Sequence, residues 1–270
     1  MKKIYITVIT LVTIFCIIGG TIFRFGLFGI PRLFFDEGEY GSYYDTVNLS
    51  SFENIKVEAD IMEVKIYTGS SFSLEYSASK KSLVPSYEIK GDTITIKQKQ
   101  KVRNNAFGIN TNNCVLTLTV PEGTKLKAID ISTNVGNAEI NRISAQSINI
   151  DSDVGDCTIL ECKFERTELE SNVGDINAKN SELGTVTGSS DVGDVSIINC
   201  GFGDLDIESD VGDVDIVSSD SLENYDINLN SDIGEVHFNN NGYKKNFTQS
   251  GNSGYKVKVT TDVGSISLEY

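Results

Sequence analysis

Aspartates recur in pairs around a Val-Gly dipeptide, and these pairs are the residues of this sequence best suited to chemistry. The complete pairs are Asp153 and Asp156, Asp191 and Asp194, and Asp210 and Asp213. Ca²⁺ prefers several carboxylate and carbonyl oxygens, so stacked pairs could form a calcium site. Asp and Asn side chains also bond backbone groups at tight turns, and we favour that role because the sequence has neither an EF-hand loop nor a Gly-Gly-x-Gly-x-Asp repeat. Calcium remains the alternative, and no other cofactor is expected.

Residue types that carry enzymatic chemistry are scarce. The single histidine, His237, stands between Val236 and Phe238 in an alternating pattern that points it outward. No Ser-His-Asp set can be nominated, and the Val-Gly-Asp motif opens no helix that could hold a phosphate. A polysaccharide-cleaving protein that works through outward carboxylates is the remaining enzymatic alternative, but the repeats leave almost no loops to wall a groove. We therefore predict a protein that is not an enzyme.

The aspartates belong to a sequence repeat of about 19 residues, and a fixed period of this length indicates a repeat architecture. The glycine at its centre recurs at Gly136, Gly155, Gly174, Gly193 and Gly212, and then more widely spaced at Gly234 and Gly264. Apolar residues alternate with polar ones before each glycine, which predicts a strand with one buried face. The apolar pair after the glycine is out of step by one residue, so the glycine must bend or bulge the chain.

One such unit buries little by itself, so the units are expected to stack. We predict an all-β fold, a single-stranded parallel β-solenoid with about 19 residues per rung and rungs about 4.8 Å apart. A left-handed hexapeptide helix does not fit, because its motif would come three times per coil. Three inward columns are expected: the aliphatic residues Ile131, Ile150, Leu169 and Ile207, the valines Val135, Val154, Val173, Val192 and Val211, and the hydroxyl residues Thr133, Ser152, Ser171, Ser190 and Ser209.

The cysteines do not indicate a disulfide framework. Cys157 falls in an inward column shared with Ala138 and Ile176. Cys162 and Cys200 are separated by two repeat lengths, so they occupy one column two rungs apart. That separation is about 9–10 Å, which is too long for a disulfide. We expect small buried packing residues and no metal site, since no Cys-x-x-Cys occurs.

Irregular segments flank the regular repeats. We predict a membrane anchor at 1–23, an aromatic and acidic linker at 24–50, an irregular β capping region at 51–127 and the regular solenoid at 128–270, with a polar insertion at 239–255. Gly91 and Asp92 should form the turn of a hairpin within the capping region. Lys256–Tyr270 should form the last rung, where Lys256 and Lys258 would protect an exposed sheet edge.

The amino-terminal segment predicts one transmembrane helix. An uncharged apolar run from Ile4 to Phe23 follows two lysines and is about long enough to span a bilayer. A cleaved signal peptide is the alternative, although its apolar core would be shorter and an Ala-x-Ala-like site is missing. The two lysines and the terminus outweigh Arg24 and Arg32, which places the carboxyl-terminal part outside the cytoplasm by the positive-inside rule.

The rest of the chain is strongly acidic. After residue 35 there are 19 lysine and arginine residues and 38 acidic residues, and between Lys179 and Lys244 there are 14 acidic residues and no lysine or arginine. Such a surface should repel nucleic acid and anionic wall polymers and attract cations or basic partners.

These features together carry a resemblance to a family. An apolar start, a strand-rich cap, the Val-Pro-Glu-Gly segment at Val120–Gly123 and repeated Ser-x-x-Gly-Asp-[Val/Ile]-x-[Ile/Leu] units resemble the bacterial "putative adhesin" β-strand-repeat proteins of unknown function. The resemblance covers roughly Ile55–Tyr270. It implies a membrane-anchored extracytoplasmic β-solenoid, supplies no catalytic residues, and implies adhesion only through its label.

We predict a non-enzymatic binding or scaffold module of putative-adhesin type on the bacterial cytoplasmic membrane. The anchor Ile4–Phe23 would cross once, with the carboxyl-terminal domain extracytoplasmic, and the partner would be an unknown protein or cell-surface component rather than nucleic acid. The alternative is an envelope-stress regulatory protein that acts on a membrane partner through the anchor. Deleting the repeats while keeping the anchor distinguishes them, because the regulator would keep its function.

Overall fold

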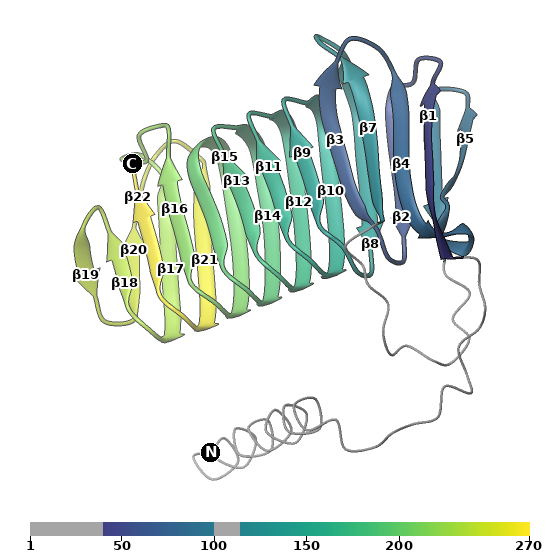
Figure 1. Ribbon diagram of the computed structural model, residues 1–270. Helices are drawn as coiled ribbons and strands as arrows, with labels where there is room; N and C mark the ends of the chain where they lie inside the picture. Colours follow the sequence, from purple (N-terminus) through teal and green to yellow (C-terminus); the bar gives the residue numbers. More distant parts are fainter. Residues whose placement is uncertain (1–39, 100–113) are drawn as a thin grey trace, which may run out of the picture. The chain divides into compact units, whose positions relative to one another are not determined.

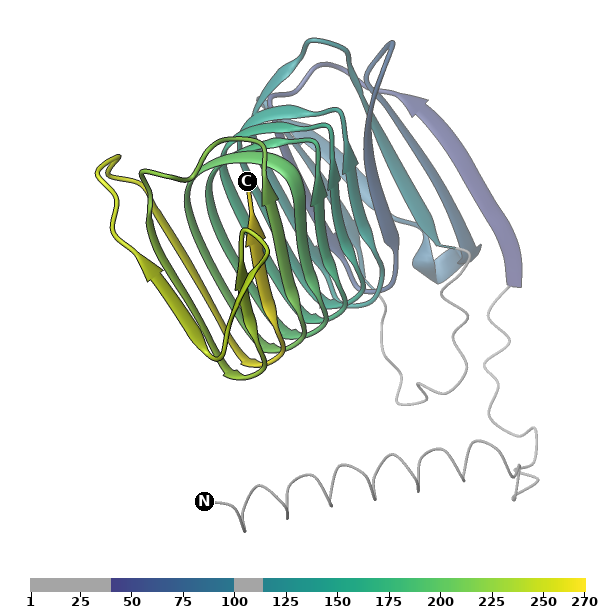
Figure 2. The same cartoon turned by 90° about the vertical axis from the view of Figure 1, so that its left-hand side faces the viewer.

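Two stacks of parallel strands, joined at glycine corners, form the repeat region (Figure 1, Figure 2). This computed structural model describes residues 40–99 and 114–270. Each coil follows one strand of a first stack, sheet B, turns at a glycine, and continues along a shorter strand of a second stack, sheet A. Apart from one 3₁₀ turn at Lys81–Leu83, the described elements are all strands, so the predicted all-β class is confirmed.

The spatial order of the strands differs from their order in the chain, and β15 lies in both sheets. From one edge to the other, sheet B contains β5 (Ser86–Lys90), β6 (Thr93–Gln98), β2 (Asn54–Ala59), β8 (Lys125–Thr133), β10 (Ser144–Val154), β12 (Lys163–Val173), β14 (Glu182–Val192), β15 (Val195–Val211), β21 (Lys256–Val263), β17 (Asp226–Ile233) and β20 (Asn246–Gln249). Sheet A contains β1 (Tyr40–Asn48), β4 (Ser73–Lys80), β7 (Val115–Pro121), β3 (Glu63–Gly69), β9 (Ala138–Asn141), β11 (Cys157–Leu160), β13 (Ile176–Lys179), β15, β16 (Val214–Ser218), β22 (Ile266–Glu269), β18 (Val236–Phe238) and β19 (Asn241–Tyr243).

Strand pairing confirms the predicted period of the repeat. In sheet B, Ile150 pairs with Leu169, Leu169 with Gly188, and Gly188 with Ile207, all in parallel. The three aliphatic side chains are at most 2% exposed, so this inward column is confirmed. Burying each contributes about 1.5–3 kcal/mol. Where Gly188 interrupts the column, the Cδ1 atom of Ile207 lies 2.7 Å from the place of a Cβ and fills the space.

The predicted hydroxyl column is also buried, and three of its five members have a defined hydrogen-bond partner. Ser152, Ser171 and Ser190 each donate a hydrogen bond of 3.2–3.4 Å to the carbonyl oxygen of the corner glycine three residues later. A buried hydroxyl without a partner costs stability, and these bonds remove that cost at the three serines. The serine therefore closes the inside of the corners at Gly155, Gly174 and Gly193, whereas the buried hydroxyls of Thr133 and Ser209 have no hydrogen-bond partner among the described residues.

The prediction that the valine column points inward is wrong. Val154, Val173, Val192 and Val211 lie above one another in register, but they are 45–50% exposed. The reason is the position of the bend: the chain already turns at the two residues before the glycine, so both point outward. The serine hydroxyl occupies the inner side of the corner, where alternation would have placed the valine.

The order of the coils departs from the order of the sequence at the carboxyl-terminal end. Strands β21 and β22 form a rung, but it is inserted between β15–β16 and β17–β18 and is not the last one (Figure 1). The expected edge-protecting role of its lysines is therefore wrong. The ammonium of Lys258 instead lies 3.1 Å from the Asp206 carboxylate and 2.6 Å from that of Glu208 on β15. These contacts offset negative charge within the stack.

The other end of the stack is arranged in the same way. Strands β2 and β3 lie between β6–β7 and β8–β9, although β6 and β7 come later in the chain. The predicted hairpin forms between β5 and β6, where Gly91 has a φ of 58°. Antiparallel strands cover the edges of the parallel ladders: β4, with β1 outside it, and β5 at this end, and β19 and β20 at the far end.

The predicted anchor Ile4–Phe23 and most of the predicted linker lie outside the described residues. Within 40–99 and 114–270, no helix has the length and apolar character needed to cross a bilayer.

Candidate functional site: the Val-Gly-Asp corner

The outward side of the glycine corners presents a regular, mixed surface that we call the corner face. It consists of the exposed valines and the acidic or amide residues on either side of them, namely Val154, Val173, Val192 and Val211, Asp153, Asn172, Asp191 and Asp210, and Asp156, Asp175, Asp194 and Asp213. Because neighbouring parallel strands are about 4.8 Å apart, each type of side chain repeats at that interval. An apolar row thus runs between two polar rows.

The glycine at each corner is required by two geometric constraints. Gly193, for example, has a φ of 148°, a conformation that side chains with a Cβ rarely adopt. A Cβ on this residue would also overlap the carbonyl oxygen of Gly174 in the preceding coil. The same overlap recurs at Gly155, Gly174 and Gly212, so close stacking of the corners depends on the absence of a side chain.

The acidic column after the glycine forms a continuous hydrogen-bonded ladder. The backbone N–H of Asp156 donates to the side-chain Oδ1 of Asn137 at 3.0 Å. The same bond repeats at 2.7–3.0 Å through the next coils, joining Asp156 to Asp175, Asp175 to Asp194, Asp194 to Asp213 and Asp213 to Ser265. The favoured interpretation expected these side chains to bond the backbone of their own tight turn, but Asp156, Asp194 and Asp213 accept bonds from backbone N–H groups of the next coil.

The acidic column before the valine is more open. The carboxylate of Asp153 accepts a bond of 3.1 Å from the side-chain amide of Asn172, whereas Asp191 and Asp210 are exposed at the equivalent place. Among the described residues, no group of three or more His, Cys, Asp or Glu side chains converges on a point that could hold a metal ion. Calcium binding at these aspartates stays a prediction.

The cysteines are buried and free, as predicted, in the described part of the chain. Burial raises the pKa of the Cys157 thiol to about 12 and that of Cys162 to about 11. Both are therefore protonated thiols at neutral pH, which suits packing and not nucleophilic chemistry. His237 is half-buried, with Nε2 3.5 Å from the carboxylate of Glu235 at the protein surface.

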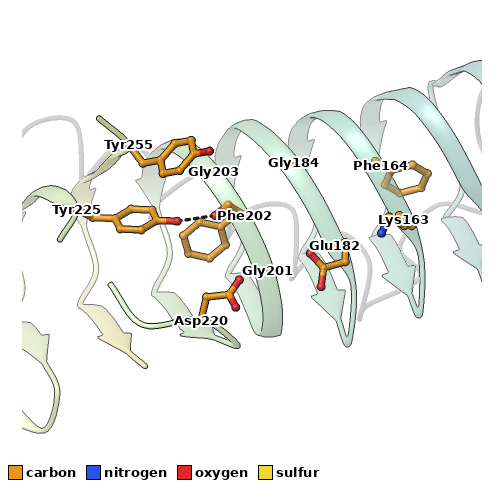
Figure 3. A pocket seen from close by; sticks show the side chains of 10 residues that line it. All are labelled: Lys163, Phe164, Glu182, Gly184, Gly201, Phe202, Gly203, Asp220, Tyr225 and Tyr255. Carbon is orange, nitrogen blue, oxygen red and sulfur yellow. Dashed lines mark hydrogen bonds between the residues drawn. The ribbon is translucent and has the colours of Figure 1, made fainter. Parts of the chain in front are cut away.

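Sequence reasoning missed a second feature, a groove at the beginning of strands β12 and β14 and at the middle of β15, away from the corner face (Figure 3). It has a volume of about 320 Å³. Its lining comes from five parts of the chain, namely Lys163 and Phe164, Glu182 and Gly184, Gly201, Phe202 and Gly203, Asp220 and Tyr225, and Tyr255. Phe164 and Phe202 are two periods apart, a signal of a shared column, but nothing in the sequence brings Tyr255 to them.

A coil of parallel strands with a repeated acidic glycine corner defines a β-solenoid repeat protein. Its sequence matches the model of the Toastrack DUF4097 family over residues 52–255, and the chain belongs to this family. The match confirms the kinship inferred from the repeated motif. A comparison with curated proteins gives no match.

Several solved structures are similar to this chain. A "putative adhesin" from Bacteroides fragilis is 19% identical, with 84% of this chain and 97% of that chain covered and a TM-score of 0.46. A "putative lipid binding protein" from Parabacteroides distasonis is 14% identical, with 86% and 95% covered and a TM-score of 0.45. A "putative cell adhesion protein" from Clostridium sporogenes is 13% identical, with 86% and 99% covered and a TM-score of 0.41. We infer nothing about the ligand of this chain from them.

Proposed function

We propose that this chain is a non-enzymatic binding module displayed on the outer face of a bacterial cytoplasmic membrane. The segment Ile4–Phe23 would anchor it by a single pass, and the corner face would contact a basic protein partner. The observation that carries the proposal is the row of half-exposed valines held in register between two rows of polar and acidic side chains.

The valine row supplies the apolar part of such a contact. Single exposed apolar residues are common on protein surfaces, but contiguous apolar patches are typical of interaction sites. Four valines, each 45–50% exposed, repeat along one line of the stack. A partner that covered them would gain about 25 cal/mol for each Å² of apolar surface removed from water.

The flanking carboxylates define the charge of the partner. Asp153, Asp191 and Asp210 lie on one side of the valines, and an unbroken aspartate series lies on the other. With no lysine or arginine between residues 179 and 244, the face should attract a basic surface and repel nucleic acid. Charge complementarity of this kind accelerates association and sets orientation more than it sets affinity.

The length and flanking charges of the amino-terminal segment support the proposed placement. The apolar run matches the thickness of a bilayer, and the two preceding lysines favour a cytoplasmic amino terminus. The repeats would then lie on the side of the membrane where surface partners are found.

Site-specific photo-crosslinking in the native host tests the proposal. A photoreactive residue is placed at Val192 in the full-length chain, with a matched control at Thr187, an exposed residue of the same strand on the flat side of sheet B. We expect a discrete adduct from Val192 alone, with a basic protein that high salt releases before irradiation. Absence of a Val192 adduct, or equal adducts from both positions, would contradict the proposal.

A further inference from the structure

The groove is walled by aromatic rings that the fold holds in place. The rings of Tyr225 and Tyr255 lie 5.4 Å apart at 30°, and the Tyr225 hydroxyl donates a bond of 3.0 Å to the carbonyl of Phe202 (Figure 3). Tyr255 packs on Gly203, where a Cβ would lie 3.3 Å from the ring. Phe202 and Tyr225 are 6% and 9% exposed, whereas Tyr255 is 49% exposed. The wall is therefore fixed, with one ring open to a ligand.

Two carboxylates face the same gap in the floor of the groove. The Oε2 atom of Glu182 lies 2.6 Å, and the Oδ2 atom of Asp220 lies 3.1 Å, from the point where a Cβ on Gly201 would stand. Gly201 leaves this point empty, so both oxygens border one small space. Of the residues lining the groove, Lys163 alone is basic.

The surroundings of Tyr225 show the sign of the local charge. Burial raises the pKa of Tyr225, and the carboxylate of Asp220, the neighbouring Tyr255 and the carboxylate of Asp204 raise it further. Negative charge therefore acts on the aromatic wall as well as on the floor.

We propose that this groove binds a guanidinium group, as presented by an arginine side chain. A guanidinium is planar, stacks on aromatic faces and carries several N–H donors that can reach two carboxylates at once. Two carboxylates fall short of the six to eight oxygens that Ca²⁺ takes. A neutral sugar could stack on Tyr255 but would gain nothing from the negative charge. The inference goes beyond the proposed function, because the groove and the corner face share no residue and neither depends on the other.

A titration of the full-length chain, labelled with nitrogen-15 at glycine, tests this assignment. The probe is N-acetyl-L-arginine amide, and its matched neutral control is N-acetyl-L-citrulline amide, which has almost the same shape without the charge. We expect saturable shifts of the amide signals of Gly184, Gly201 and Gly203, with none at Gly91 and Gly123 on the far turns. The citrulline control should cause shifts only at concentrations at least about tenfold higher, since a lost charged hydrogen bond is worth about a factor of ten.

Variants identify the groups responsible. Glu182→Gln and Asp220→Asn should each weaken arginine amide binding about tenfold, and Gly201→Ala should abolish it by filling the gap. Glu170→Gln on the outer side of β12 removes the same charge elsewhere and should change nothing, whereas Lys163→Gln should strengthen binding. If Gly201→Ala does not fold, the charge variants decide. Equal binding of the two amides, binding of methyl β-D-glucoside in place of arginine, or full binding by the charge variants would overturn the proposal.

Discussion

The carboxylate of Asp175 accepts a hydrogen bond of 2.9 Å from the backbone N–H of Asp194, the residue at the same place one coil later. Stacking like charges about 5 Å apart costs about 1 kcal/mol per pair in water. A hydrogen bond to a charged group contributes about 1.5–3 kcal/mol, reduced at an exposed site. The bond offsets the repulsion, which explains how the stack tolerates a continuous column of aspartates.

Two substitutions separate the hydrogen bond from the charge. Asp175→Ala removes the acceptor and should lower the free energy of unfolding by about 1 kcal/mol. Asp175→Asn keeps the acceptor, as Asn137 does in the first coil, and should be neutral or slightly stabilising because one repulsive charge is removed. Urea denaturation of both variants measures the difference. Equal losses of stability would show that the charge, not the bond, matters.

The corner glycines should not tolerate alanine. Gly193→Ala would place a methyl group on the Gly174 carbonyl oxygen as well as straining a φ of 148°, so we expect a loss of at least about 3 kcal/mol. Gly254→Ala is the control, because Gly254 also has a positive φ, of 83°, but has no atom within 4 Å of a new Cβ. It should cost only about 1–2 kcal/mol. Thermal unfolding of the two variants gives the comparison, and similar losses would contradict the overlap argument.

Stability should depend on pH through Asp215. Asp215 is largely exposed, but partial desolvation by its neighbours, followed by the charges of Asp213, Asp194 and Glu269, raises its pKa in the folded protein. The folded state therefore keeps the proton more readily than the unfolded chain, so ionised Asp215 lowers stability above its folded pKa. Asp215→Asn should raise the Tm at pH 7, and the gain should shrink as the pH falls and vanish below about pH 3, where both states are protonated. Glu170→Gln removes one negative charge elsewhere and serves as the control. An equal gain in Tm from Glu170→Gln would show that the gain comes from the lower net charge and not from the raised pKa of Asp215.

Removing the carboxyl-terminal rung should disrupt the fold far more than removing a cap would. Deleting residues 256–270 takes away Val259, Ile266 and Leu268, each fully buried, and leaves one edge of β15 and one edge of β17 unpaired. We expect loss of the cooperative thermal transition, and its recovery when a synthetic peptide of residues 256–270 is added. Tyr270→Ser, which spares β22, should keep the transition. A truncated chain that unfolds cooperatively by itself would refute the interior position of this rung.

Calcium gives a further test of the corner face. Because Asp156, Asp175, Asp194 and Asp213 already accept backbone N–H bonds, we expect the Tm to be the same in millimolar calcium and in chelator. A calcium-dependent rise in Tm that disappears in Asp191→Asn and Asp210→Asn would instead establish a metal site.

The repeat itself made much of the fold predictable. A shift by one repeat length carries Ile150 onto Leu169 and Ser152 onto Ser171, so the period alone fixes which side chains stack. Alternation then separates buried from exposed positions along each strand, and the glycine marks the corner. The buried, unpaired state of Cys162 and Cys200 followed from the same spacing.

Alternation failed where the chain stops being straight. Val192 comes two residues after the buried Ser190, so alternation predicts that it is buried. The bend begins before Gly193, however, and turns the valine outward. The order of the coils failed for another reason: β21 presents the same alternating face to any neighbour, so local pattern cannot tell an interior rung from a terminal one. The groove depended on that order, because Tyr255 reaches Gly203 only when β21 lies beside β15.

The insertion of β21 between β15 and β17 also constrains the course of biosynthesis. The coil containing β17 and β18 leaves the ribosome before β21 exists, so its final position, two strand spacings or about 9.6 Å from β15, can be completed only after residues 256–270 emerge. At this end of the stack, the coils therefore cannot be added one after another in the order in which they are synthesised. A prematurely stopped or nicked polypeptide would present two open strand edges, which are prone to aggregation. Completion of this end of the stack is thereby coupled to the synthesis of residues 256–270.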